Sequence, residues 1–243
     1  MKIRSLLSVA SSVWLASTAS GQNFQNLDFD SANLVFPIPG GNPFTTVAIA
    51  LPGWTATVGG NPFSSAFYDA IPLDSSYVGI FDANAPDYMP RPLCAEGYGA
   101  MLAAGYGGDV NLSQTGIIPA SARSISFWTT GPTGFIGGQH DPGVQLAING
   151  HVLEAYDVDY EGGWKLCAAD VSSYAGGSAQ VSFSLKSYYR PGNIGAYEYY
   201  LDDISFSTVD IPEPGAGCLA VWGIAAAAGW RRIVYGKCAG LYT

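Results

Sequence analysis

Basic residues, histidines and cysteines are all scarce in this 243-residue chain. Lysine and arginine together number 10 against 19 acidic residues, so the formal net charge is −9. A surplus of negative charge repels the phosphates of nucleic acids and the headgroups of anionic membranes. We therefore expect neither as a partner, whereas cations and neutral sugars are compatible with this charge.

The chain also lacks the short motifs of common enzymes. It contains no Gly-x-Ser-x-Gly elbow, no His-Glu-x-x-His pair and no phosphate-binding loop, each of which places a reacting group in a defined geometry. Its two histidines are His140, in a glycine-rich stretch that makes a poor rigid platform, and His151 beside a predicted turn. The sequence therefore predicts a protein that is not an enzyme. A glycan-acting enzyme with paired carboxylates stays an alternative, because spacing alone does not exclude it.

The N-terminal residues have the three parts of a secretory signal peptide. Lys2 and Arg4 supply positive charge, an apolar stretch follows, and small residues come after it. Such a stretch is too short for a stable membrane span, and the small residues suit signal peptidase. We expect residues 1–21 to be removed by cleavage between Gly21 and Gln22, with a cut two residues earlier as the alternative.

The C-terminal tail also has three parts. Pro212 and Pro214 hold the peptide around Glu213 extended, and an exposed, extended peptide is what a protease can bind. The apolar run of residues 217–230 would span roughly 21 Å as a helix, against roughly 30 Å for a hydrocarbon core. The basic end, residues 231–243, is expected on the cytoplasmic side. Such a tail is expected to anchor the protein only transiently.

This tail, residues 210–243, resembles the PEP-CTERM sorting signal of bacteria with an outer membrane. The resemblance is carried by the motif in residues 211–215, the apolar run and the two arginines that end it. It implies that an exosortase-type membrane protease cuts near the motif once the chain has crossed the inner membrane. It also implies that the protein then reaches the cell surface or extracellular matrix. A plain membrane anchor after a proline-rich stem is the alternative.

Only two cysteines, Cys94 and Cys167, lie between the two end segments. Their spacing suggests neither a zinc nor an iron–sulfur site. An exported chain reaches an oxidising compartment, which permits a disulfide between Cys94 and Cys167. Two buried thiols are the alternative.

Residues 22–209 are predicted to form one all-β domain. The chain's 31 glycines and 15 prolines interrupt every helical pattern, and short runs rich in β-branched and aromatic residues lie between them. The clearest hairpin is Val144–Ile148 followed by Asn149-Gly150, because Asn-Gly favours a type I′ turn. Residues 180–187 alternate apolar and polar side chains, so one face should be buried. These patterns predict a two-sheet antiparallel β-sandwich.

Short motifs along this domain resemble those of galactose-binding-like jelly rolls, the fold of many carbohydrate-binding modules. They lie at residues 26–30, 51–54, 164, 170–177 and 201–204. The resemblance implies a structural calcium ion held between the first and last strands, with backbone carbonyls completing a shell of about six to eight oxygens. The implied ligands are Asp28, Asp30, Asp202 and Asp203. Solvated strand ends are the alternative.

Aromatic side chains near the end of the domain suggest a surface for sugars. Sugars present apolar C–H faces that stack on aromatic rings. The candidate ligand-binding residues are Trp164, Tyr188, Tyr189 and Tyr199, and Trp128 belongs to the same aromatic group. Aromatic residues also fill sandwich cores, which is the alternative.

The leading hypothesis is an exported, surface-sorted β-sandwich of the cell envelope or extracellular matrix, without enzymatic activity. Its expected partners are signal peptidase and an exosortase-type protease, and the membrane holds it through the tail until processing. The first alternative is a carbohydrate-binding module with an extracellular polysaccharide as its partner. The second is the glycan-acting enzyme.

Overall fold

A computed structural model describes residues 22–34, 44–69, 75–82, 97–130, 143–187 and 197–211. The expected signal peptide and the tail from the processing motif Pro212-Glu213-Pro214 onwards lie outside these ranges. Cys94, Tyr188 and Tyr189 also lie outside them. None of the helices within the described ranges is long and apolar enough to cross a membrane.

The described residues are mostly in β-strands, with one short helix and one 3-10 turn. In chain order the elements are β1 (Phe44–Thr46), α1 (Val47–Ala50), β2 (Thr55–Val58), β3 (Asn61–Phe63), β4 (Ser65–Tyr68), β5 (Tyr77–Asp82), β6 (Tyr98–Ala104), β7 (Val110–Ile117), β8 (Ser124–Thr130), β9 (Val144–Ile148), β10 (His151–Val152), β11 (Ala155–Glu161), β12 (Trp164–Asp170), η2 (Ser172–Tyr174), β13 (Ser178–Leu185) and β14 (Tyr197–Ser207).

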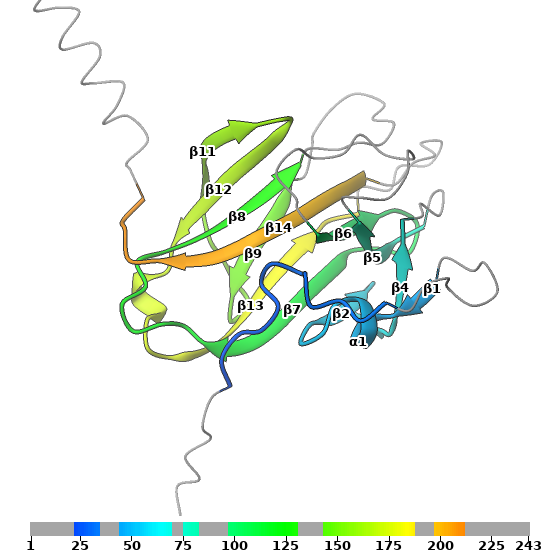
Figure 1. Ribbon diagram of the computed structural model, residues 1–243, viewed down its shortest axis with the longest axis horizontal. Helices are drawn as coiled ribbons and strands as arrows, with labels where there is room; N and C mark the ends of the chain where they lie inside the picture. Colours follow the sequence, from blue (N-terminus) through cyan, green and yellow to red (C-terminus); the bar gives the residue numbers. More distant parts are fainter. Residues whose placement is uncertain are drawn as a thin grey trace, which may run out of the picture.

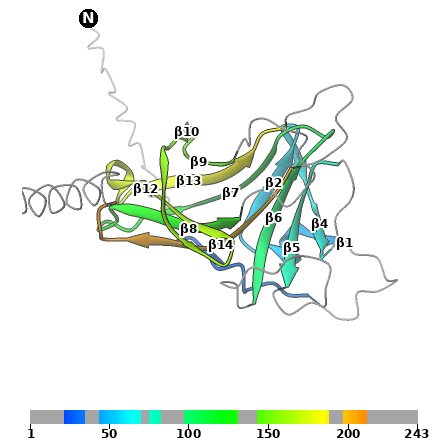
Figure 2. The same cartoon turned by 90° about the horizontal axis from the view of Figure 1, so that it is seen from above.

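These strands form two sheets packed face to face, as the sequence predicted (Figure 1, Figure 2). One has eight strands in the order β1-β4-β5-β6-β14-β8-β12-β11, and the other has six in the order β10-β9-β13-β7-β2-β3. The strand pairs are antiparallel apart from β4 and β5, which run parallel. That pair differs from the purely antiparallel sandwich expected. A parallel pair needs a connection longer than a hairpin turn, and the eight residues between Tyr68 and Tyr77 are long enough to exceed one.

The side chains between the sheets form the main hydrophobic core. Strand β13 shows the predicted alternation, because Val181, Phe183 and Leu185 are buried and the residues between them are more exposed. The ring of Phe183 contacts Trp54 and Phe127, with centroid separations of 6.2 and 5.0 Å. Burial of large rings removes the most apolar area from water, which is the main stabilising term of such a fold.

A second apolar cluster lies on the other face of the eight-stranded sheet. Along β5, Val78 and Ile80 belong to the main core, whereas Tyr77 and Phe81 belong to the second cluster. Successive side chains of a strand point to opposite faces, so the two clusters are on opposite sides of the sheet. Trp164 also belongs to this second cluster. Both faces of this sheet are therefore partly apolar.

The predicted Asn149-Gly150 turn is confirmed, and a second turn precedes β13. Between β9 and β10, Asn149 and Gly150 have φ values of 51° and 79°, and a type I′ turn requires positive φ at both positions. Before β13, the carboxylate of Asp170 accepts a hydrogen bond from the backbone N–H of Ser172 at 2.8 Å, which supports η2. Gly176, with φ 78°, then returns the chain to the sheet.

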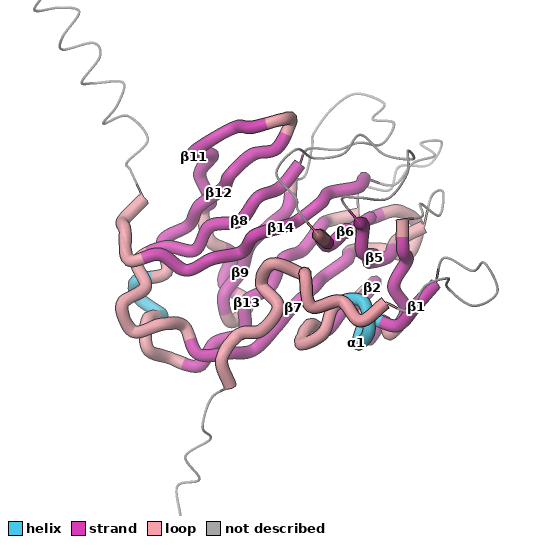
Figure 3. The backbone as a smooth tube through the Cα atoms, viewed as in Figure 1, coloured by secondary structure: helices cyan, strands magenta, loops and turns pink. Residues whose placement is uncertain are grey.

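The segment before β1, which carries Asp28 and Asp30 and which the resemblance implied to be the first strand, is irregular (Figure 3). It still lies beside the last strand. The backbone N–H of Ile204 donates to the carbonyl of Leu27 at 3.0 Å, and the rings of Phe24 and Phe206 lie 5.3 Å apart. β14 pairs with β6 only as far as Leu201. The N-terminal segment thus continues the hydrogen bonding of β14 where β6 stops.

Candidate functional site

The candidate site is built around an irregularity in β14. The pairing of β14 with β8 shifts register between Asp202 and Ser205, which marks a β-bulge, and Asp203 within it has φ 48°. A positive φ is unfavourable for a residue with a Cβ, although aspartate tolerates it better than most. Bulges are common next to functional sites because they re-aim a side chain. Here the bulge exposes the Asp203 carboxylate beside its buried neighbour Asp202.

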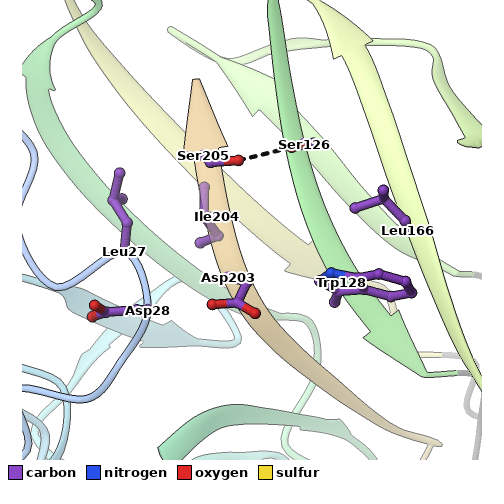
Figure 4. Close-up of a pocket in the computed structure, with 8 residues that line it drawn as sticks. All are labelled: Leu27, Asp28, Ser126, Trp128, Leu166, Asp203, Ile204 and Ser205. Atoms are coloured by element: carbon purple, nitrogen blue, oxygen red, sulfur yellow. Dashed lines mark hydrogen bonds between the residues drawn. The ribbon is translucent and has the colours of Figure 1, made fainter. Parts of the chain in front are cut away.

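A shallow depression of about 440 Å³ opens beside this bulge. It is lined by Leu27, Asp28, Ser126, Trp128, Leu166, Asp203, Ile204 and Ser205 (Figure 4). Its polar groups are two exposed carboxylates and two hydroxyls, and the hydroxyl oxygens of Ser126 and Ser205 lie 2.9 Å apart in a hydrogen bond. We call this surface the Trp128 depression.

Strand alternation brings its lining residues together. In β8, Ile125 and Phe127 point into the main core, so Ser126 and Trp128 point to the opposite face. Leu166 of β12 lies directly opposite Trp128 in the ladder. The indole ring is half-buried and packs against the second apolar cluster, which holds it in place. The outward face of β8 therefore presents an ordered aromatic ring next to polar groups.

The four aspartates predicted to be neighbours do influence one another. Burial raises the pKa of Asp202 to about 8, and the nearby charges of Asp203, Asp30 and Asp28 add to the increase. The pKa of Asp203 is also raised, first by burial and then by Asp30 and Asp28. The carboxylate of Asp202 accepts a hydrogen bond from the backbone N–H of Asp203 at 2.8 Å. The contact between the N-terminal segment and β14 therefore brings acidic side chains close enough to raise the pKa of Asp202 and of Asp203.

These carboxylates do not converge into a metal site in this arrangement. Within the described ranges, no three His, Cys, Asp or Glu side chains form a group that could hold a metal ion. The carboxylate of Asp30 accepts a hydrogen bond from the backbone N–H of Tyr98 at 2.8 Å. It also packs against Gly97, where an added Cβ would lie 1.9 Å from its oxygen. Of the four, only Asp28 and Asp203 line the depression (Figure 4). Calcium binding by all four would require side-chain rearrangement, and it stays a prediction.

Two of the expected ligand-binding aromatics are buried instead, which corrects the expectation for them. Trp164 is 2% exposed, in the second apolar cluster, and Tyr199 is 1% exposed, in the main core. Neither ring has a face available for a sugar. Trp128 is more exposed and can therefore contact a ligand, and the sequence pattern of β8 already distinguishes it. It is the bulky residue among the otherwise small, polar, outward positions of β8.

Cys167 is a buried thiol rather than a reactive one. Its S–H group donates to the carboxylate of Asp157 with an Sγ–Oδ1 separation of 3.4 Å. Burial first, then the hydrogen bond to Asp157 and the Asp157 charge, raise its pKa to about 12, so the nucleophilic thiolate is disfavoured. Its pairing with Cys94 stays a prediction, because Cys94 lies outside the described ranges.

The chain matches no protein-family model and no curated protein. Weak similarity to solved structures is found, among them the following three. A cyclase from Fischerella sp. TAU is 15% identical with a TM-score of 0.44, and the match covers 76% of this chain and 94% of that one. TmCBM61 in complex with β-1,4-galactotriose is 16% identical with a TM-score of 0.37, covering 77% and 99%. A carbohydrate-binding module of the β-sandwich superfamily is 11% identical with a TM-score of 0.38, covering 78% and 64%. At this similarity they assign neither ligand nor activity.

Ionisation of Asp202 is expected to destabilise the protein. Its pKa in the folded state is about 8, so the folded chain keeps this proton where the unfolded chain has lost it. The free energy of unfolding should therefore fall between about pH 4 and pH 8, by at most about 1.4 kcal/mol per pH unit. Asp202→Asn keeps an oxygen for the Asp203 N–H and should flatten this slope. Urea unfolding across that range in chelator-containing buffer measures it, with Asp159→Asn as an exposed control; an unchanged slope would contradict the assignment.

Calcium, if bound between Asp28 and the β14 bulge, should stabilise the folded state alone. At a free concentration of about a hundred times Kd the gain is about 2.7 kcal/mol, which a melting curve resolves readily. We expect a chelator to lower the melting temperature of calcium-loaded protein and to have no effect on the Asp28→Asn/Asp203→Asn variant. Identical curves for the unsubstituted protein in calcium and in chelator would remove calcium from this site.

Proposed function

We propose that this protein is an exported β-sandwich of the jelly-roll, galactose-binding-like type that binds a polysaccharide through the Trp128 depression and has no catalytic activity of its own. The observation that carries this is the half-buried indole of Trp128, which lies in an open surface depression beside hydroxyl and carboxylate groups. Pyranose rings combine apolar C–H faces with equatorial hydroxyls, so they need an aromatic platform with polar groups at its edge.

The shape of the site also favours a polymer over a small metabolite. Sites for small molecules are usually enclosed and remove most of the ligand from water. The Trp128 depression instead lies on the outward face of three neighbouring strands, β14, β8 and β12. A glycan chain can cross such a surface with one residue stacked on the ring, while its neighbours extend over the sheet.

We also propose that the chain follows the sorting route implied by its ends. It would cross the inner membrane, lose its signal peptide, stay briefly anchored, and be cut near Pro212-Glu213-Pro214 by an exosortase-type protease. Hydrogen bonds near the two ends of the sandwich support this route. Gln22 accepts a hydrogen bond from Ile117 N–H at 2.9 Å, and Val209 accepts one from the Ser124 hydroxyl at 2.8 Å. Both proposed cuts would therefore leave these contacts of the sandwich intact.

Removal of the indole tests the binding site. Trp128→Ala should weaken binding to extracellular polysaccharide by about 2 kcal/mol, or roughly thirtyfold, as loss of a central aromatic contact does. Affinity electrophoresis through gels containing the polysaccharide measures this. Trp128→Phe, which keeps most of the packing, should retain part of the binding. Tyr160→Ala removes an aromatic that is 64% exposed on β11 and should leave binding unchanged.

A melting curve of each variant accompanies this test. Equal binding by Trp128→Ala and the unsubstituted protein would overturn the site, and release of reducing ends from the polysaccharide would support the glycan-acting enzyme instead.

The mass of the exported protein tests the sorting route. We expect a chain that begins at or near Gln22 and ends within or close to the Pro212-Glu213-Pro214 motif. Replacing that motif by three alanines should leave the tail attached and the protein in the membrane fraction. An extracellular protein that is intact to Thr243, or a full-length chain recovered from the cytosol, would rule this route out.

A further inference from the structure

We propose that the Trp128 depression selects glycans that carry free amino groups, such as deacetylated amino sugars, over glycans that carry uronic acids. This inference rests on the proposed function and names the class of ligand for the same site. It follows from the charges that line the depression and from their position relative to the indole ring.

The charges that line the depression are negative among the residues that the structure describes. In that part of the chain, the charged side chains of the lining are Asp28 and Asp203, and none is a cation. The cations of the described ranges are occupied elsewhere or lie outside the lining. Lys186 is 2.8 Å from Asp109, and Lys165 is 3.7 Å from Asp157. Lys165 also precedes Leu166 in β12, so the two side chains point to opposite faces of the strand.

Two carboxylates of the depression come from different segments of the chain. Asp28 belongs to the N-terminal segment and Asp203 to the β14 bulge, and both line the depression (Figure 4). Both are exposed, so a ligand can reach them from solvent. Asp30 adds to the negative field, since its charge raises the pKa of both Asp202 and Asp203. Asp202 has a pKa of about 8, so below that pH it keeps its proton and adds no charge. An ammonium group would relieve this repulsion, whereas a uronate would add to it.

The indole ring makes the same preference stronger. Asp203 lies between Asp28 and Trp128 in the depression (Figure 4), so a sugar stacked on the ring directs a substituent towards the carboxylates. The face of an indole ring also attracts cations directly. A protonated amino sugar can therefore meet the ring and form an ion pair with the acids, while a neutral sugar meets the same groups through stacking and hydroxyl hydrogen bonds alone.

Two oligosaccharides that differ only in N-acetylation test this inference. Binding of the full chain to glucosamine oligomers, to N-acetylglucosamine oligomers of equal length and to galacturonate oligomers is measured by calorimetry. The buffer is mildly acidic, so that the amine is protonated and ordinary carboxylates are ionised, and it contains a chelator to keep calcium from the acids. We expect the glucosamine oligomer to bind about threefold to tenfold more tightly than the N-acetylated oligomer. Two partly exposed ion pairs supply a binding free energy of this size. The galacturonate oligomer should bind most weakly, and added salt should reduce the differences.

Variants assign the preference to these two acids. Asp28→Asn/Asp203→Asn should abolish it while keeping weak, Trp128-dependent binding of the acetylated oligomer. Asparagine tolerates the positive φ at position 203, so the bulge is retained. Asp159→Asn removes one exposed charge from β11, away from the lining, and should leave the preference unchanged.

The possible failures are distinguishable. If the acetylated or uronate oligomer binds as tightly as the glucosamine oligomer and Trp128→Ala still weakens binding, the amine preference is wrong but the binding site stands. If the preference survives in Asp28→Asn/Asp203→Asn, these acids do not provide it. If Trp128→Ala affects no oligomer, the proposed function itself is wrong.

Discussion

The change of partner along β14 is the constraint on which the site depends. This strand pairs with β6 as far as Leu201, shifts its register with β8 after Asp202, and then donates the N–H of Ile204 to the N-terminal segment. A continuous strand would alternate its side chains regularly between core and surface. The bulge breaks that alternation, because the core positions are Tyr199 and Leu201 before it and Ile204 after it, which leaves Asp202 and Asp203 together between them. The acidic half of the depression exists because two segments far apart in sequence meet at this irregularity.

Part of this arrangement could be predicted from the sequence, because short-range patterns determine it. The Asn149-Gly150 turn needs only two residues with positive φ, and the buried face of β13 needs only alternation. The proximity of Asp28 and Asp203 was also anticipated, through the expected meeting of the first and last strands. The bulge itself was not, since it depends on where β6 ends, and no local pattern in residues 201–204 shows that.

The aromatic residues show where pattern analysis of this chain reaches its limit. Alternation indicates that a ring points to one face of a strand, but it does not show whether that face is exposed to solvent. Trp164 points to the outer face of the eight-stranded sheet and is nevertheless buried in a second apolar cluster. Trp128 points to the same face two strands from β6 and stays half-exposed. Which of the two can meet a ligand depends on the extent of that cluster, and this is a property of the assembled sheet.

The second cluster also explains how an open, shallow site could bind usefully. A flexible exposed side chain must lose rotamer freedom on binding, which costs about 0.5–1.5 kcal/mol for each side chain immobilised. The indole of Trp128 is already packed against the cluster that contains Trp164 and Tyr200. The Ser126 and Ser205 hydroxyls are already oriented by their mutual hydrogen bond. Much of the ordering is therefore complete in the folded protein, because the apolar face that hides Trp164 from ligands is the same face that holds Trp128 in position for them.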